Sequence, residues 1–205
     1  MDYIKSYFKL FKTPKKYFKS IKPSLQESYT FFLLFYLVFF LLTLLFNVLT
    51  FFFDPITRDI FTLLTVPFIV GYFFFSLILG LAMPLIFTLI FHAGLYFVAH
   101  KINFKKTFDA TTRSHTVLIT YSLISAFIAM FLTGFFYTTP YFTLLVTSIS
   151  TLIALAGVTH YLYAVSEGLS IYHKLPLSTT ILSVIVIPLF FVLVILLLLV
   201  LTALA

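Results

Sequence analysis

The chain has 205 residues, of which 62% are hydrophobic and 9% are charged. Soluble domains carry about 25% charged residues, so this composition excludes a water-exposed globular fold and predicts an all-α, polytopic transmembrane bundle. Cysteine is absent, which excludes disulfides, thiol catalysis and thiolate metal sites. The net charge of +7 comes from residues beside apolar segments, so it does not predict nucleic-acid binding.

Residues 1–27 form a basic segment ahead of the first apolar run. Lysines recur at intervals of four and three, on one face of a helix, at Lys5, Lys9, Lys12, Lys16 and Lys19. Apolar and aromatic residues fall on the other side, at Ile4, Tyr7, Phe8, Phe11 and Phe18. Thr13 followed by Pro14 predicts an N-cap and first helical position, so two short helices should meet there. The pattern is typical of an amphipathic helix in the membrane interface, with lysines facing anionic headgroups. The alternative is that the lysines only retain the N-terminus in the cytoplasm.

Residues 28–205 are predicted to form one transmembrane domain of five helices. The spans are expected at about 28–53, 64–99, 114–137, 141–165 and 177–204. Short turns at 54–59 and 138–140 should separate them on one side of the membrane. Loops at 100–113 and 166–176 should separate them on the side of the N-terminus.

The second span decides the topology, because residues 60–100 run for 41 residues without a charged side chain. One long, tilted helix over about 66–98 is one solution, and two short spans with a break near Gly80 and Pro84 are the other. A single helix places 12 of the 13 Lys and Arg residues on the side of the N-terminus, leaving only Arg58 opposite. The positive-inside rule therefore favours one helix, a cytoplasmic N-terminus and an extracytoplasmic C-terminus.

Ionisable residues within apolar spans are functional candidates by default. His92, His160 and Glu167 form a candidate polar intramembrane cluster, for which a metal or proton site is conceivable. Hydrogen bonds between helices explain the same residues without chemistry, and that interpretation is preferred. The sequence shows no H-E-x-x-H motif, glycine-rich phosphate loop or paired acids within a span. No catalytic, cofactor or metal site is therefore predicted, and the chain is not expected to be an enzyme.

Several short motifs follow one another in a recognisable order. A proline leads an aromatic and basic stretch at 13–18, a His-x-Gly stands at 92–94, and a basic loop follows at 105–108. Tyr121 and Ser122 lie in the next span, and 162–171 lead through Leu-Pro-Leu-Ser at 175–178 into the last apolar helix. In this order the chain resembles the Yip-domain family, five-span membrane proteins named for interacting with Ypt/Rab GTPases. It lacks the Asp-Leu-Tyr-Gly-Pro motif of eukaryotic members and looks more like a prokaryotic member.

The resemblance implies a non-enzymatic membrane organiser or adaptor, acting in membrane shaping, trafficking or the assembly of partners. The expected partners are anionic membrane lipids, together with another protein or a second copy of the chain, and the expected location is the cell membrane. The alternative is a small-solute or ion transporter with its site near the break in the second span, because broken helices at membrane depth often line cavities.

Overall fold

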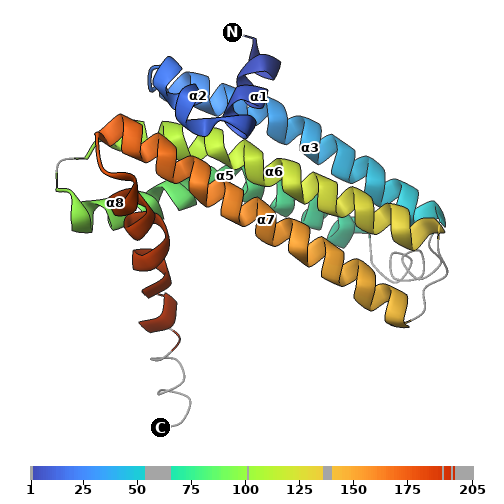
Figure 1. Ribbon diagram of the computed structural model, residues 1–205. Coiled ribbons are helices and arrows are strands. Elements are labelled where there is room, and N and C mark those ends of the chain that lie inside the picture. Colours follow the sequence, from blue (N-terminus) through green and yellow to red (C-terminus); the bar gives the residue numbers. More distant parts are fainter. Residues whose placement is uncertain are drawn as a thin grey trace. The chain divides into compact units, whose positions relative to one another are not determined.

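The computed structural model describes residues 2–53, 66–100, 102–135, 140–190, 192–194 and 196, and all regular structure in these ranges is helical (Figure 1). Along the chain it comprises α1 (Tyr3–Lys12), α2 (Pro14–Ser20), α3 (Leu25–Phe53), α5 (Val66–Val98), α6 (Phe104–Phe135), α7 (Pro140–His173), α8 (Leu177–Ile181) and the π-helix η1 (Leu182–Val186). The prediction of an all-α fold is confirmed.

Within the described residues, five helical segments are long and apolar enough to cross a membrane. They are Leu25–Phe46, Val70–Val98, Phe104–Leu132, Tyr141–His173 and Leu177–Val194. The predicted number of spans is therefore confirmed. The predicted polar turn at 54–59 with Arg58, the turn residues 138 and 139, Lys101 and the end of the fifth span beyond 196 lie outside the described residues.

The two N-terminal helices meet where the sequence predicts. Asp2 caps α1 by accepting a hydrogen bond from the Lys5 amide at 3.2 Å, and Pro14 occupies the first position of α2, where its missing N–H costs nothing. The Thr13 side chain makes no capping bond to α2. Its hydroxyl instead donates to the Lys9 carbonyl at 3.2 Å, so it closes the end of α1.

The long apolar run is one helix, as the charge distribution favours. α5 continues through both Gly80 and Pro84 to Val98. Proline removes one backbone hydrogen bond from a helix, and the Thr88 hydroxyl donates to the Pro84 carbonyl at 2.6 Å one turn later. The alternative of two short spans is wrong, and the break on which the transporter interpretation depended is absent from α5.

Two predicted loops are largely helical. α6 begins at Phe104 rather than near 114, and α7 continues to His173 rather than ending near 165. Most polar side chains in these stretches are buried, although Lys105 is exposed. Burial of these side chains lets the helices extend beyond the predicted spans. α7 ends where Lys174 adopts a positive φ of 56° and the Leu175 amide donates to the Ser170 carbonyl at 3.1 Å.

The chain divides into two compact units. The first comprises Met1–Tyr29, Pro84–Ser114 and Tyr161–Ala205, and the second comprises Thr30–Met83 and His115–His160. In the first unit, α1 and α2 lie beside the first turns of α3 and the last turns of α7 (Figure 1). This unit contains the basic N-terminal face and most of the buried polar side chains.

Candidate functional site

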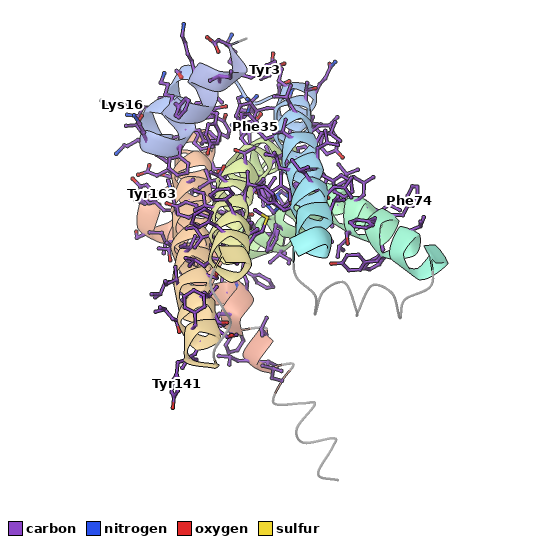
Figure 2. The ribbon with its side chains drawn as sticks, turned by 90° about the vertical axis from the view of Figure 1, so that its right-hand side faces the viewer. Tyr3, Lys16, Phe35, Phe74, Tyr141 and Tyr163 are labelled. Carbon is purple, nitrogen blue, oxygen red and sulfur yellow. The ribbon has the colours of Figure 1, made fainter. Side chains whose placement is uncertain are left out.

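The basic face of α1 and α2 is open to solvent. All five predicted headgroup lysines are exposed: Lys5, Lys9, Lys12, Lys16 and Lys19. Figure 2 shows Lys16 pointing away from the helices. Two of the lysines make only local contacts, Lys5 with Asp2 at 3.4 Å and Lys9 with the Ser20 hydroxyl at 2.8 Å. The ammonium groups are therefore placed to meet an anionic surface.

The apolar side of the same helices is divided between two environments. Leu10, Tyr17 and Phe18 are at most 1% exposed and form part of the core of the first unit. Ile4 and Phe8, one turn apart on α1, are 65% and 55% exposed. α2 is thus anchored to the protein, whereas α1 presents an apolar edge next to its lysines.

A buried ion pair lies under α2. Asp109 and Arg113 stand one turn apart on α6, and both side chains are fully buried. The Arg113 Nε donates to both carboxylate oxygens of Asp109, at 3.0 and 3.1 Å. A buried charge is tolerated only when its remaining donors and acceptors are also paired, so the neighbours of this pair decide whether it is stable.

Those neighbours come from four separate segments. Arg113 donates through Nη1 to the Tyr17 hydroxyl of α2 at 3.0 Å, and its Nη2 lies 3.6 Å from the Glu27 carboxylate of α3. Asp109 accepts from the Tyr172 hydroxyl of α7 at 2.8 Å and from the Ser24 amide at 2.9 Å. Burial raises the pKa of Tyr17 to about 12, against the opposing effect of the Arg113 charge. Tyr17 therefore stays protonated at physiological pH.

Close packing completes the attachment of α2. The Phe18 ring meets the Tyr172 ring edge to face, with centroids 5.4 Å apart. A Cβ at Gly168 of α7 would lie 2.9 Å from the Phe18 ring and 3.0 Å from the Ala110 side chain. The absence of a side chain at Gly168 therefore lets Phe18 settle between α6 and α7. The N-terminal segment is held by this packing and by the ion-pair cluster of Tyr17, Ser24, Glu27, Asp109, Arg113 and Tyr172.

The motifs behind the family resemblance, apart from Tyr121 and Ser122, belong to this unit. Tyr17 and Phe18 end the aromatic and basic stretch, Thr107 belongs to the basic segment before the third span, and Gly168 lies in the stretch before the last helix. The family model of the Yip1 domain matches residues 8–200. The chain belongs to the Yip1-domain family. Comparison with curated proteins and with solved structures gave no match.

The predicted polar cluster of this Yip1-domain chain has three separate sets of hydrogen-bond partners. His92 Nδ1 lies 3.1 Å from the Thr107 hydroxyl, His160 Nδ1 lies 3.3 Å from the Tyr121 hydroxyl, and Glu167 accepts from Tyr163 at 3.2 Å. In the part of the chain that the structure describes, no group of three or more His, Asp and Glu could hold a metal. Each of the three side chains thus has a hydrogen-bond partner of its own.

Two histidines of the first unit converge on one hydroxyl. Thr107 is fully buried, and its Oγ1 lies 3.1 Å from His92 Nδ1 and 3.2 Å from His173 Nε2. A hydroxyl donates only one proton, so at least one of the two imidazoles donates to Thr107. The arrangement joins α5, α6 and the end of α7.

The ion-pair cluster is the part of the site that sequence reasoning missed. The sequence predicts a loop at 100–113, in which the charges of Asp109 and Arg113 serve only to orient the chain. Their spacing of four residues is the signal that could have found them, because it is the spacing of an ion pair on one helix face. The run of Thr, Ser and His around them, at 111–116, is also too polar for a span and too poor in charge for an exposed loop.

Proposed function

We propose that this Yip1-domain protein is a non-enzymatic membrane organiser that gathers anionic lipid around its N-terminal helices. The single observation that supports the proposal most is the arrangement of α1 and α2. The five lysines of their basic face are all exposed, while Tyr17 and Phe18 fix the segment to the bundle. A basic face fixed beside membrane spans meets headgroups continuously rather than by chance encounter.

The exposed edge of α1 supports a membrane-shaping role in the same proposal. Ile4 and Phe8 lie beside the lysines and are more than half exposed. An amphipathic helix of this kind buries its apolar edge about 5–10 Å below the headgroups. Insertion of α1 into one leaflet would expand that leaflet alone, which favours curvature. Attachment through α2 would impose this effect wherever the protein resides.

The proposal includes a cytoplasmic N-terminus, an extracytoplasmic C-terminus and residence in the cell membrane. It also includes a protein partner or a second copy of the chain, which the family's interaction role suggests. Native mass spectrometry of the protein extracted with its lipids should detect retained anionic lipid together with such a partner. Recovery of a stoichiometric metal or small solute instead would contradict an organiser role.

The direct test uses the full chain and the absence of tryptophan from its sequence. Phe8→Trp provides a single fluorophore on α1. In bilayers containing brominated lipid, its emission should be quenched strongly when anionic lipid is present and weakly when all lipid is zwitterionic. Changing the five lysines to glutamate should remove this difference, because the headgroup attraction is then reversed.

The matched control changes the same five lysines to arginine, which keeps the charge and should preserve the quenching. Far-UV circular dichroism of each variant shows whether the helices remain folded. Equal quenching in anionic and zwitterionic bilayers, or quenching that survives the change to glutamate, would contradict the proposal.

A further inference from the structure

The second unit contains an elongated groove between α3, α5 and α6. Its inner part is a cavity of about 330 Å³ with walls from all three helices, and its outer part is a cavity of about 290 Å³ between α3 and α5. The two cavities share Phe40, Leu44 and Phe73 as lining residues. The two cavities therefore adjoin along the helices, and together they are called the groove.

The groove changes from polar to apolar along its length. Its inner wall contains Tyr36 and His115, each only 6% exposed, and the hydroxyl-bearing Ser76 and Ser122. The Tyr36 hydroxyl donates toward the carbonyls of Ser76 and Leu77, at 3.2 and 3.3 Å. The outer part is lined by six residues, all apolar: Phe40, Leu44, Val70, Phe73, Phe74 and Leu77. The outer part of the groove is therefore suited to a hydrocarbon chain.

Gly80 shapes the inner end. A Cβ at this position would overlap the Tyr36 ring, so only glycine lets the ring lie against α5. The ring then forms a wall of the cavity instead of filling it. The groove is therefore built by a specific pairing of α3 with α5.

The groove is long enough to hold one lipid chain. Its lining on α5 extends from Met83 to Val70, which is about 20 Å at 1.5 Å per residue. One leaflet contributes about 15 Å of hydrocarbon. Tyr36 and Met83 lie near the middle of the candidate spans Leu25–Phe46 and Val70–Val98, whereas Val70 begins its span. The groove therefore extends from near the end of α5 at Val70 toward the middle of the spans.

The outer end is continuous with the lipid-facing surface of α5. Val70 is 47% exposed and Phe74 is 62% exposed, and Figure 2 shows Phe74 pointing outward from the helix. We propose that the groove holds one acyl chain of a bilayer lipid. The chain lies along Phe73, between the lipid-facing edge at Phe74 and the inner end at Tyr36 and His115. This site is separate from the lysine face and involves none of its residues.

Photolabelling of the full-length protein in bilayers tests the site. The probe is phosphatidylcholine that carries a diazirine on one acyl chain, in a bilayer of unlabelled phosphatidylcholine. Labelling of Phe40, Leu44 and Phe73, located by peptide mass spectrometry, should saturate as the probe fraction rises. Labelling of Leu41, which is 62% exposed on α3 and lines neither cavity, should increase in proportion to the probe. Proportional labelling at the groove residues as well would overturn the proposal.

Variants that fill the groove provide the second measurement. Leu44→Trp and Ser76→Phe place a large side chain inside it from α3 and from α5, and each should abolish the saturable labelling. Leu41→Trp adds the same bulk outside the groove and should leave labelling unchanged. Saturable labelling that persists in both filled variants would overturn the site, as would crosslinks from the groove to a second copy of the chain. Because saturation is measured on the unchanged protein, the test does not depend on the variants folding.

Discussion

At the scale of single residues, Arg113 connects more segments of this protein than any position that the sequence analysis selected. Its guanidinium reaches α2 through Tyr17, α3 through Glu27 and its own helix through Asp109. These partners offset the cost of burying the guanidinium, because a buried charge without partners is strongly destabilising. The attachment of the N-terminal helices therefore depends on an ion pair that no solvent reaches.

The first prediction concerns the loss of that charge. Arg113→Gln should destabilise the first unit by about 3–5 kcal/mol, since it leaves the buried Asp109 carboxylate without its counterion. Replacing both partners, with Asp109→Leu and Arg113→Met together, should cost less than Arg113→Gln alone. Thermal unfolding of the detergent-solubilised protein, followed by circular dichroism, measures both effects.

The exposed pair of Lys5 and Asp2 offers a matched control. Their side chains are 88% and 52% exposed, and an exposed ion pair contributes about 0–1 kcal/mol. Lys5→Gln should therefore leave the unfolding temperature nearly unchanged. If Lys5→Gln lowered the unfolding temperature as much as Arg113→Gln, burial would not determine how much these ion pairs stabilise the protein.

The second prediction uses the pKa of Tyr17. Its folded-state pKa of about 12 lies above the ordinary value of 10, so the protonated form is favoured in the folded state. Its stabilising contribution is therefore complete below about pH 10 and is lost as the pH rises through 12. The ionised phenolate would face Asp109 and Glu27 as well as Arg113. We expect α2 to detach in this alkaline range.

The emission of Phe8→Trp, recorded from pH 8 to pH 12.5, should report this detachment. The same reporter combined with Tyr17→Phe is the control, because it keeps every lysine but has no phenol to ionise at position 17. Identical titrations of the two proteins would show that Tyr17 does not control the attachment of α2.

At the scale of elements, the sequence predicts the bounds of a helix well where its residues are apolar and poorly where they are polar. The continuous α5 follows from an uncharged run and from the distribution of lysines around it. The polar extensions of α6 and α7 cannot be predicted in this way, because charged residues between apolar runs ordinarily indicate an exposed loop. Whether Asp109 and Arg113 face water or are buried depends on contacts between segments up to 96 residues apart, such as that of Arg113 with Tyr17. Periodicity within one segment contains no information about such contacts.

The third prediction concerns the crossing of α5 with η1. A Cβ at Gly94 would overlap the backbone carbonyl of Ser183, which has no flexible end that could move aside. Gly94→Ala should therefore force the helices apart and destabilise the protein by about 1–3 kcal/mol. Thermal unfolding of the detergent-solubilised protein measures this decrease in stability.

Gly71 is the matched control on the same helix. No atom lies within 4 Å of a Cβ placed there. Gly71→Ala removes the backbone freedom of glycine from an exposed helical position, and it should be neutral or stabilising by up to about 1 kcal/mol. If both substitutions destabilised equally, close approach of η1 would not be the reason that position 94 is glycine.

At the scale of the whole molecule, the family, the helical fold and the number of spans could be predicted from the sequence, whereas the candidate site was predicted only on its exposed side. The lysines of α1 and α2 follow from helical periodicity alone. Their support by Tyr17, Gly168 and Tyr172 does not, because a tyrosine or glycine in an apolar sequence gives no sign of its partner. The positions of the exposed lysines follow from the periodicity of single helices. The positions of the buried residues depend on how several helices pack together.

The last prediction concerns the orientation of the chain in the membrane. Lys16 precedes all five spans, and Tyr141, which is 86% exposed, follows the third. An odd number of crossings places them on opposite sides, and the lysines favour the cytoplasm for the N-terminus. The chain has no cysteine, so Lys16→Cys and Tyr141→Cys each introduce a single thiol. A membrane-impermeant maleimide added to intact cells should label position 141 at once and position 16 only after permeabilisation. Labelling of position 16 before position 141 would show that the N-terminus is extracytoplasmic. Labelling of both positions from one side would require an even number of crossings between them, which a single continuous α5 does not permit.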